Sequence, residues 1–112
     1  MEFESRESFR VDSQNLISYR LFNAENQVFH EGMATTIDIS RTGIAIKTSN
    51  AMETGLRIEV AIAVGDEIVK SIGKVRNRKQ IGAEEYHIGI EFDFLSEDNL
   101  DKLATIYPEI NK

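Results

Sequence analysis

Apolar and polar residues alternate along most of the chain with a period of two, the spacing that is typical of β-strands. The alternation is clearest from Leu56 to Val64, where every second residue is a large aliphatic residue that can face a core. The same pattern predicts strands over residues 15–22, 28–39, 44–48, 56–64, 68–75 and 86–94. Polar turns separate them: Gly65-Asp66 has the composition of a hairpin turn, and Gly32 indicates a bulge or bend within the second strand.

The last predicted strand places alternate residues from Tyr86 to Phe94 on its core face, and the period changes directly after it. Ser96 is suited to cap a helix, and acidic residues follow in the first turn, where the helix dipole favours negative charge. An apolar stripe at helical spacing comes next, and Pro108, the only proline, is expected to end the helix. These observations predict an all-β fold, a six-stranded antiparallel barrel with one C-terminal α-helix that covers an open end or edge.

The length of 112 residues fits one small domain with a single hydrophobic core. The chain is 41% hydrophobic and 29% charged, which is typical of a globular protein rather than a disordered one. We expect a single domain over residues 1–112, with an N-terminal arm at 1–12, the barrel at 13–95 and the helix at 96–107. We separate residues 1–12 from the barrel because their apolar residues do not recur with the period of a strand or a helix.

The formal net charge of -6 argues against a general affinity for DNA or RNA. A small anionic ligand remains compatible with it, because a local cluster of basic residues decides that case. The chain has no cysteine, which excludes disulfides and thiolate chemistry and agrees with a cytoplasmic location. No apolar run approaches the length of a membrane span, and the first residues do not form a signal peptide.

Candidate catalytic and metal-binding residues are few. His30 and His87 are the only histidines, and they lack the spacing of a metal-binding pair. The pattern of a nucleophile elbow is also absent from the sequence. We therefore expect no metal site, no cofactor and no enzymatic activity.

A basic segment, Arg76–Gln80, follows the fifth predicted strand. We interpret it as the end of a hairpin whose side chains are solvated. The alternative is that these side chains contact a partner or supply an additional contact to a ligand.

Two short polar motifs are the candidates for binding. Arg6 and Arg10 lie four residues apart in the arm, and Asp38, Ser40 and Gly43 follow at the corner between the second and third strands. Each motif alone has an ordinary explanation, a solvated arginine pair and a polar turn. Together they offer guanidinium groups, a carboxylate, a hydroxyl and free backbone amides, which suit a polar ligand.

In this order, the two motifs resemble the signature of the PilZ domain family, Arg-x-x-x-Arg near the N-terminus and then Asp/Asn-x-Ser-x-x-Gly. The matching segments are Arg6–Arg10 and Asp38–Gly43, and Tyr86–Phe92 is similar to the last strand of the family. The resemblance covers essentially the whole chain. Members are small bacterial split β-barrels that bind the second messenger cyclic di-GMP, so the resemblance implies that fold and that ligand.

By this resemblance, we expect the protein to be a cyclic di-GMP receptor that relays occupancy to a downstream protein partner. Because the arm has no hydrophobic pattern and carries both arginines, we expect the ligand to order it. Arg6 and Arg10 would hold phosphate and guanine, because a guanidinium fork suits both. Asp38 would accept hydrogen bonds from a guanine, Ser40 would bond a base or a phosphate, and Gly43 would allow close approach of the backbone.

Many family members carry another arginine directly before the first motif arginine, and here that residue is Ser5. The resemblance therefore favours a single bound ligand over a stacked pair. The alternative function is a PilZ-like structural or interaction protein that binds no nucleotide, for example in pilus assembly or motility. Such members generally lack the motif arginines, whereas this chain keeps Arg6 and Arg10.

Overall fold

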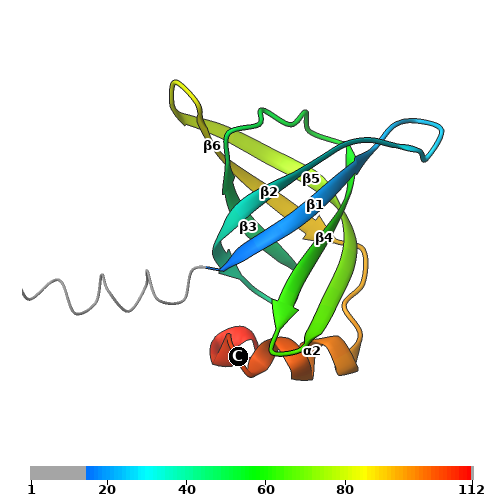
Figure 1. The fold of residues 1–112 in the computed structure, drawn as a ribbon, viewed down its shortest axis with the longest axis vertical. Coiled ribbons are helices and arrows are strands. Elements are labelled where there is room, and N and C mark those ends of the chain that lie inside the picture. Colours follow the sequence, from blue (N-terminus) through cyan, green and yellow to red (C-terminus); the bar gives the residue numbers. More distant parts are fainter. Residues whose placement is uncertain (1–14, 112) are drawn as a thin grey trace, which may run out of the picture.

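The computed structural model describes residues 15–111, which form a β-barrel with a short helical segment at its C-terminal end (Figure 1). The strands are β1 (Leu16–Phe22), β2 (Val28–Ile39), β3 (Gly43–Thr48), β4 (Arg57–Val64), β5 (Glu67–Gly82) and β6 (Glu85–Phe92). Helix α2 (Glu97–Ala104) and the 3-10 helix η1 (Pro108–Asn111) follow. The strand order is β1-β2-β3-β6-β5-β4, and an antiparallel β1–β4 ladder closes the barrel. The prediction of a six-stranded antiparallel barrel with a C-terminal helix is confirmed.

Alternate residues of the strands point into the barrel and form its core, as the period of two predicts. Ile46, Ile58 and Ile88, on three different strands, have no exposed surface. Leu100 and Leu103 of α2 are also buried, because the helix lies across one end of the barrel (Figure 1). At the opposite end, the segment between β3 and β4 crosses the opening and buries Met52. Both ends of the core are therefore covered by chain segments outside the sheet.

Helix α2 begins at the predicted cap. The hydroxyl of Ser96 accepts a hydrogen bond from the Asn99 amide (3.1 Å), which satisfies one free donor of the first turn. The helix ends at Ala104, earlier than the predicted boundary at residue 107. Pro108 opens η1, where the fixed φ of proline fits and its missing N–H costs no hydrogen bond.

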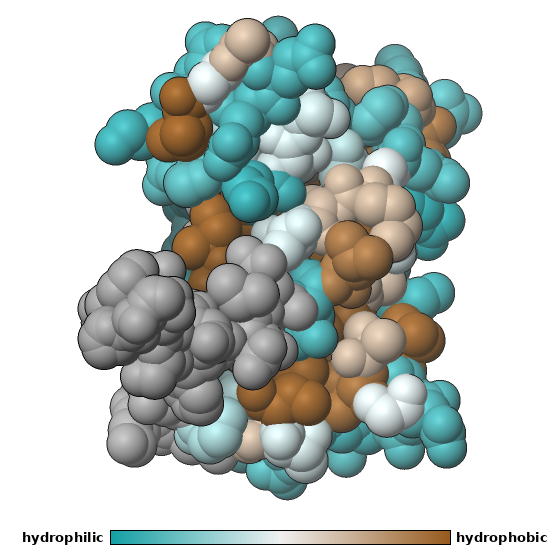
Figure 2. Space-filling view, turned by 60° about the vertical axis from the view of Figure 1, so that its left-hand side comes forward, coloured by the Kyte–Doolittle hydropathy of each residue, from teal (hydrophilic) through white to brown (hydrophobic). Residues whose placement is uncertain are grey.

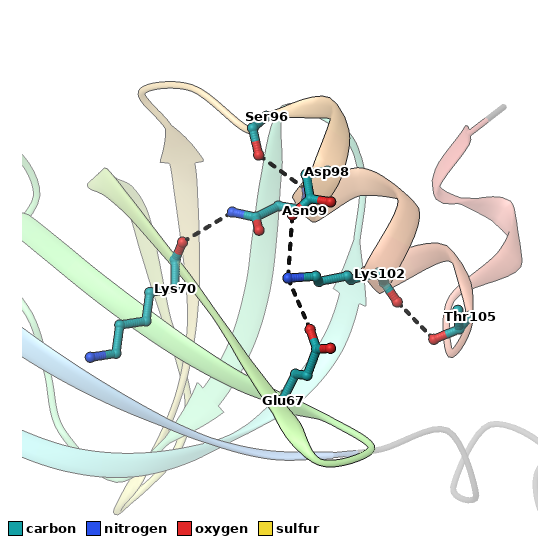
Figure 3. A network of polar contacts seen from close by, with 7 residues as sticks. All are labelled: Glu67, Lys70, Ser96, Asp98, Asn99, Lys102 and Thr105. Atoms are coloured by element: carbon teal, nitrogen blue, oxygen red, sulfur yellow. Dashed lines mark hydrogen bonds and ion pairs between the residues drawn. The ribbon is translucent and has the colours of Figure 1, made fainter.

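Polar contacts hold α2 against the β4–β5 hairpin (Figure 3). Lys102 Nζ lies 2.9 Å from a Glu67 carboxylate oxygen and 3.3 Å from Asp98, one helical turn earlier. Hydrogen bonds from this amine to Glu67 and Asp98 raise the pKa of Lys102, so the amine stays protonated. The Asn99 side chain also donates to the Lys70 carbonyl (3.4 Å). These contacts fix the helix over one end of the barrel.

Strand β5 is longer than the sequence predicts, so the interpretation of Arg76–Gln80 as a hairpin end is wrong. This segment lies within β5, and the turn follows at residues 83–84. Every residue from Arg76 to Gly82 is exposed, because the β5–β6 hairpin extends beyond the core (Figure 1). Without a core to face, this half of the strand carries no apolar alternation, and the sequence pattern could not reveal it.

Two other expectations are also wrong. Strand β6 ends at Phe92, and Phe94 is 77% exposed instead of facing the core. Gly32 lies in regular register opposite Tyr19, with no bulge. A Cβ at position 32 would lie 2.6 Å from the Tyr19 hydroxyl oxygen, so the glycine makes room for the phenol ring.

The outer face of the barrel is mixed in polarity. Figure 2 shows hydrophobic side chains gathered over the middle and lower part of one face, and mostly hydrophilic side chains at its upper end. Leu16, Met33 and Ile37 are among the exposed large hydrophobic residues. Within residues 15–111, no helix has the length and hydropathy needed to cross a membrane.

Replacing the helix cap, Ser96→Ala, is expected to lower the free energy of unfolding by about 1 kcal/mol, because the first turn of α2 loses its side-chain acceptor. Ser18→Ala is the matched control, since Ser18 is exposed in the middle of β1 and should change stability by less than about 0.5 kcal/mol. Urea unfolding of the two variants and the wild type measures both values. Equal stability of the two variants would contradict the capping role.

Candidate functional site

The predicted binding corner is the hairpin between β2 and β3. The Ser40 N–H donates to the Gly43 carbonyl (2.8 Å), and the Ser40 hydroxyl accepts from the Thr42 N–H (3.3 Å). The Thr42 carbonyl in turn accepts from the Phe92 N–H (2.8 Å), which ties the corner to the end of β6. Ser40 therefore shapes the turn while its side chain remains exposed.

A β-bulge in β2 decides where Asp38 points. Thr36 pairs with Ile46 and Asp38 pairs with Ala45, so Ile37 is the extra residue between the two pairs. Thr36 is buried on the core face, and in a regular strand Asp38 would share that face two residues later. The inserted residue reverses the alternation and brings the Asp38 carboxylate to the outer surface.

A second bulge acts in the same way on β5. Val75 pairs with Ile90 and Asn77 pairs with Gly89, which leaves Arg76 as the extra residue. Val75 is buried, whereas Asn77 is exposed on the outer surface. The two bulges therefore bring Asp38 and Asn77 to the same side of the barrel wall.

The register aligns these residues in one row across four neighbouring strands. Asp38 pairs with Ala45, Ala45 pairs with Gly89, and Gly89 pairs with Asn77. Ala45 and Gly89, in the middle of the row, have small side chains or none, so the sheet surface is hollowed there between the polar residues at the two ends. These four residues line a surface hollow of about 270 Å³, together with Ser40, Thr42, Gly43, Ile44, Arg76, Ile90 and Glu91.

Charged groups border the hollow on the side of β5 and β6. Arg76 Nε donates to a Glu91 carboxylate oxygen, and both side chains are more than half exposed. The guanidinium and the carboxylate largely cancel each other at this edge. The hollow therefore contains acceptors from Asp38 and Glu91 and donors from Arg76 and Asn77, the mixture that a ligand with both donors and acceptors requires.

Gly43 has a structural reason to be glycine. A Cβ at this position would overlap the carbonyl oxygen of Ile90 on β6, which pairs closely with β3 here. The absence of a side chain thus permits the β3–β6 ladder itself. This explanation is independent of any ligand.

The structure brings three of the predicted site residues, Asp38, Ser40 and Gly43, to the wall of one hollow. Arg6 and Arg10, with Ser5, lie outside the described residues. Arg76, Asn77 and Glu91 line the same hollow, although neither polar motif includes them. For Arg76–Gln80, the sequence left a ligand contact only as an alternative. Their signal was weak, because the bulge at Arg76 breaks the alternation that would have located the outer face.

The histidines take part in local contacts. His30 Nε2 lies 3.4 Å from the Tyr19 hydroxyl, and His87 Nε2 lies 3.5 Å from a Glu85 carboxylate oxygen. Among residues 15–111, no group of three or more histidine, aspartate or glutamate side chains is arranged to hold a metal ion.

Comparison with known protein families gives one match. The model of the PilZ domain matches residues 4–107, a range that includes both polar motifs. No curated protein matches the chain.

Gly43→Ala is expected to lower the free energy of unfolding by about 1 to 3 kcal/mol, because the added methyl group forces β3 and β6 apart. Gly82→Ala is the control, since a Cβ at that position would meet only Glu85 at an ordinary 3.9 Å. Denaturant unfolding of the two variants measures the difference. If the two variants had the same stability, the close approach of the β6 backbone would not be what requires glycine at position 43.

Proposed function

The chain belongs to the PilZ domain family, whose model matches nearly all of it, and from this premise we propose that it is a receptor for cyclic di-GMP. The family is one of binding domains rather than enzymes, so the proposed function is recognition without catalysis. We further propose that the ligand binds in the hollow at the β2–β3 corner and that binding is relayed to a protein partner. The lack of cysteine fits a cytoplasmic setting for this role.

The observation that carries the proposal is the outward turn of Asp38. The bulge at Ile37 leaves this carboxylate exposed beside the Ser40 hydroxyl on the wall of a hollow. A carboxylate can accept two hydrogen bonds from adjacent N–H groups, as the guanine edge with N1–H and the exocyclic amine presents them.

The start of the described chain supports a role for the arm. The Asn15 carbonyl accepts from the Thr36 N–H (3.0 Å), so the chain meets β2 two residues before Asp38. Arg10 lies five residues before Asn15, a length of chain that spans at most about 17 Å. That reach brings the guanidinium of Arg10 within range of the corner, and Arg6, four residues earlier in the chain, has a longer reach.

In the proposed mechanism, the ligand brings the arm onto the barrel. Two phosphates and two guanines offer acceptors to Arg6 and Arg10, and charge-assisted hydrogen bonds of about 1.5 to 3 kcal/mol each offset the entropy of ordering a few residues. The ordered arm would then present a new surface to the partner. With Ser5 in place of a further arginine, the proposed stoichiometry is one ligand per chain.

Isothermal titration with cyclic di-GMP tests the proposal. We expect saturable binding by the wild type, and a loss of about 2 to 5 kcal/mol of binding free energy in Arg6→Ala or Arg10→Ala, the usual cost of removing one partner from a buried charged contact. Arg20→Ala is the charge-matched control, because Arg20 pairs with Glu59 (2.7 Å) on the β1–β4 wall, away from the corner. This variant should bind as the wild type does.

Absence of heat and of NMR shifts at high micromolar cyclic di-GMP would overturn the receptor function and support the alternative, an interaction protein that binds no nucleotide. A melting temperature of Arg6→Ala or Arg10→Ala far below that of the wild type would show that the arginines stabilise the fold instead.

Amide hydrogen exchange with and without cyclic di-GMP tests the mechanism. We expect the ligand to slow exchange at residues 6–10 and to leave residues 1–4 unchanged, since the available hydrogen bonds can offset the ordering of only a few residues. Residues of β1 and β4, on the far side of the barrel, serve as the internal reference. Full protection of residues 6–10 before ligand is added would contradict the ordering mechanism.

A further inference from the structure

Asn77 has an unusual place for a polar side chain. Its amide lies flat over Gly89 on the neighbouring strand, where a Cβ would meet Asn77 Oδ1 at 2.6 Å and Nδ2 at 2.8 Å. The bulge at Arg76 turns it outward, at the opposite end of the row from Asp38. The bulge at Arg76 turns the Asn77 side chain outward, and the missing side chain of Gly89 lets the amide lie close to the sheet surface.

The Asn77 amide is also an uncommitted donor of the hollow. Arg76 donates to Glu91, and the hydroxyls of Ser40 and Thr42 lie within hydrogen-bond distance of each other (3.3 Å). Among residues 15–111, the Asn77 side chain makes no hydrogen bond or ion pair. Its N–H donors are therefore available to a ligand at no cost in broken protein contacts.

The separation of the two ends of the row suits one elongated ligand. The Asn77 amide lies over Gly89 on β6, two strand spacings from Asp38 on β2, a distance of about 10 Å along the sheet. Between them, Ala45 keeps the floor of the hollow low. A ligand that spans this row meets a pure acceptor at one end and a side chain with two donors at the other.

We propose that Asn77 is a further ligand-binding residue of the site, and that its Nδ2 donates to the O6/N7 edge of the guanine that lies farther from Asp38. The inference rests on the proposed binding of cyclic di-GMP and adds a residue that contacts the second base. Guanine presents two acceptors, N7 and O6, along this edge. Adenine presents N7 and an N6 amino group along the same edge, and an asparagine amide can pair with these through Nδ2 and Oδ1, so this contact by itself does not select guanine over adenine.

The test is a titration of the full chain with cyclic di-GMP. Asn77→Ala should weaken the binding of cyclic di-GMP about tenfold, because the guanine edge loses a hydrogen-bond donor. Asn77→Asp should weaken cyclic di-GMP further, because it replaces the donors with a negative charge that also repels phosphate. Gln27→Ala, at an exposed amide in the β1–β2 turn, is the matched control and should bind as the wild type does.

Thermal unfolding should give the same midpoint for all four proteins, because Asn77 and Gln27 are exposed. If the wild type binds cyclic di-GMP and both Asn77 variants bind it within twofold of the wild type, the role of Asn77 is overturned while the receptor function stands. If the wild type does not bind cyclic di-GMP, the receptor function itself is overturned, and this inference falls with it.

Discussion

Closure of the barrel is the constraint on which the rest of the structure depends. Each of the six strands is hydrogen-bonded on both sides, so no strand can shift by one residue without breaking two ladders. The face on which a side chain lies is then determined by its position in the strand, and only an inserted residue can change it. Ile37 and Arg76 are such insertions, and the hollow of the candidate site exists because they turn Asp38 and Asn77 outward.

Two glycines connect the stability of the barrel with the shape of the site. Gly43 allows β3 to approach the Ile90 carbonyl, and Gly89, two residue pairs further along the same ladder, leaves room for the Asn77 amide. A side chain at either position would alter the β3–β6 region that forms the floor of the hollow. The glycines that permit close packing of the strands therefore also determine the depth of the hollow.

The first described residue joins three parts of the fold. The Asn15 carbonyl accepts from the Thr36 N–H, and its side-chain amide donates to the Tyr107 hydroxyl (2.9 Å), beyond the end of α2. The chain thus enters the barrel between the strand that carries the bulge and the C-terminal segment. In the proposed receptor function, the position of Asn15 limits how far Arg6 and Arg10 can reach toward the hollow.

The sequence by itself determined the number of strands, the capped C-terminal helix and the two polar motifs, because these depend on local periodicity and on residues close together in the chain. The barrel core from Leu56 to Val64 and the cap at Ser96 lie where the pattern predicts them. Only the tertiary structure decided that β5 continues through Arg76–Gln80 and that Asn77 lies in one row with Asp38. Register and bulges arise from pairing between strands far apart in the sequence, so no local pattern could specify which polar residues meet on the outer wall.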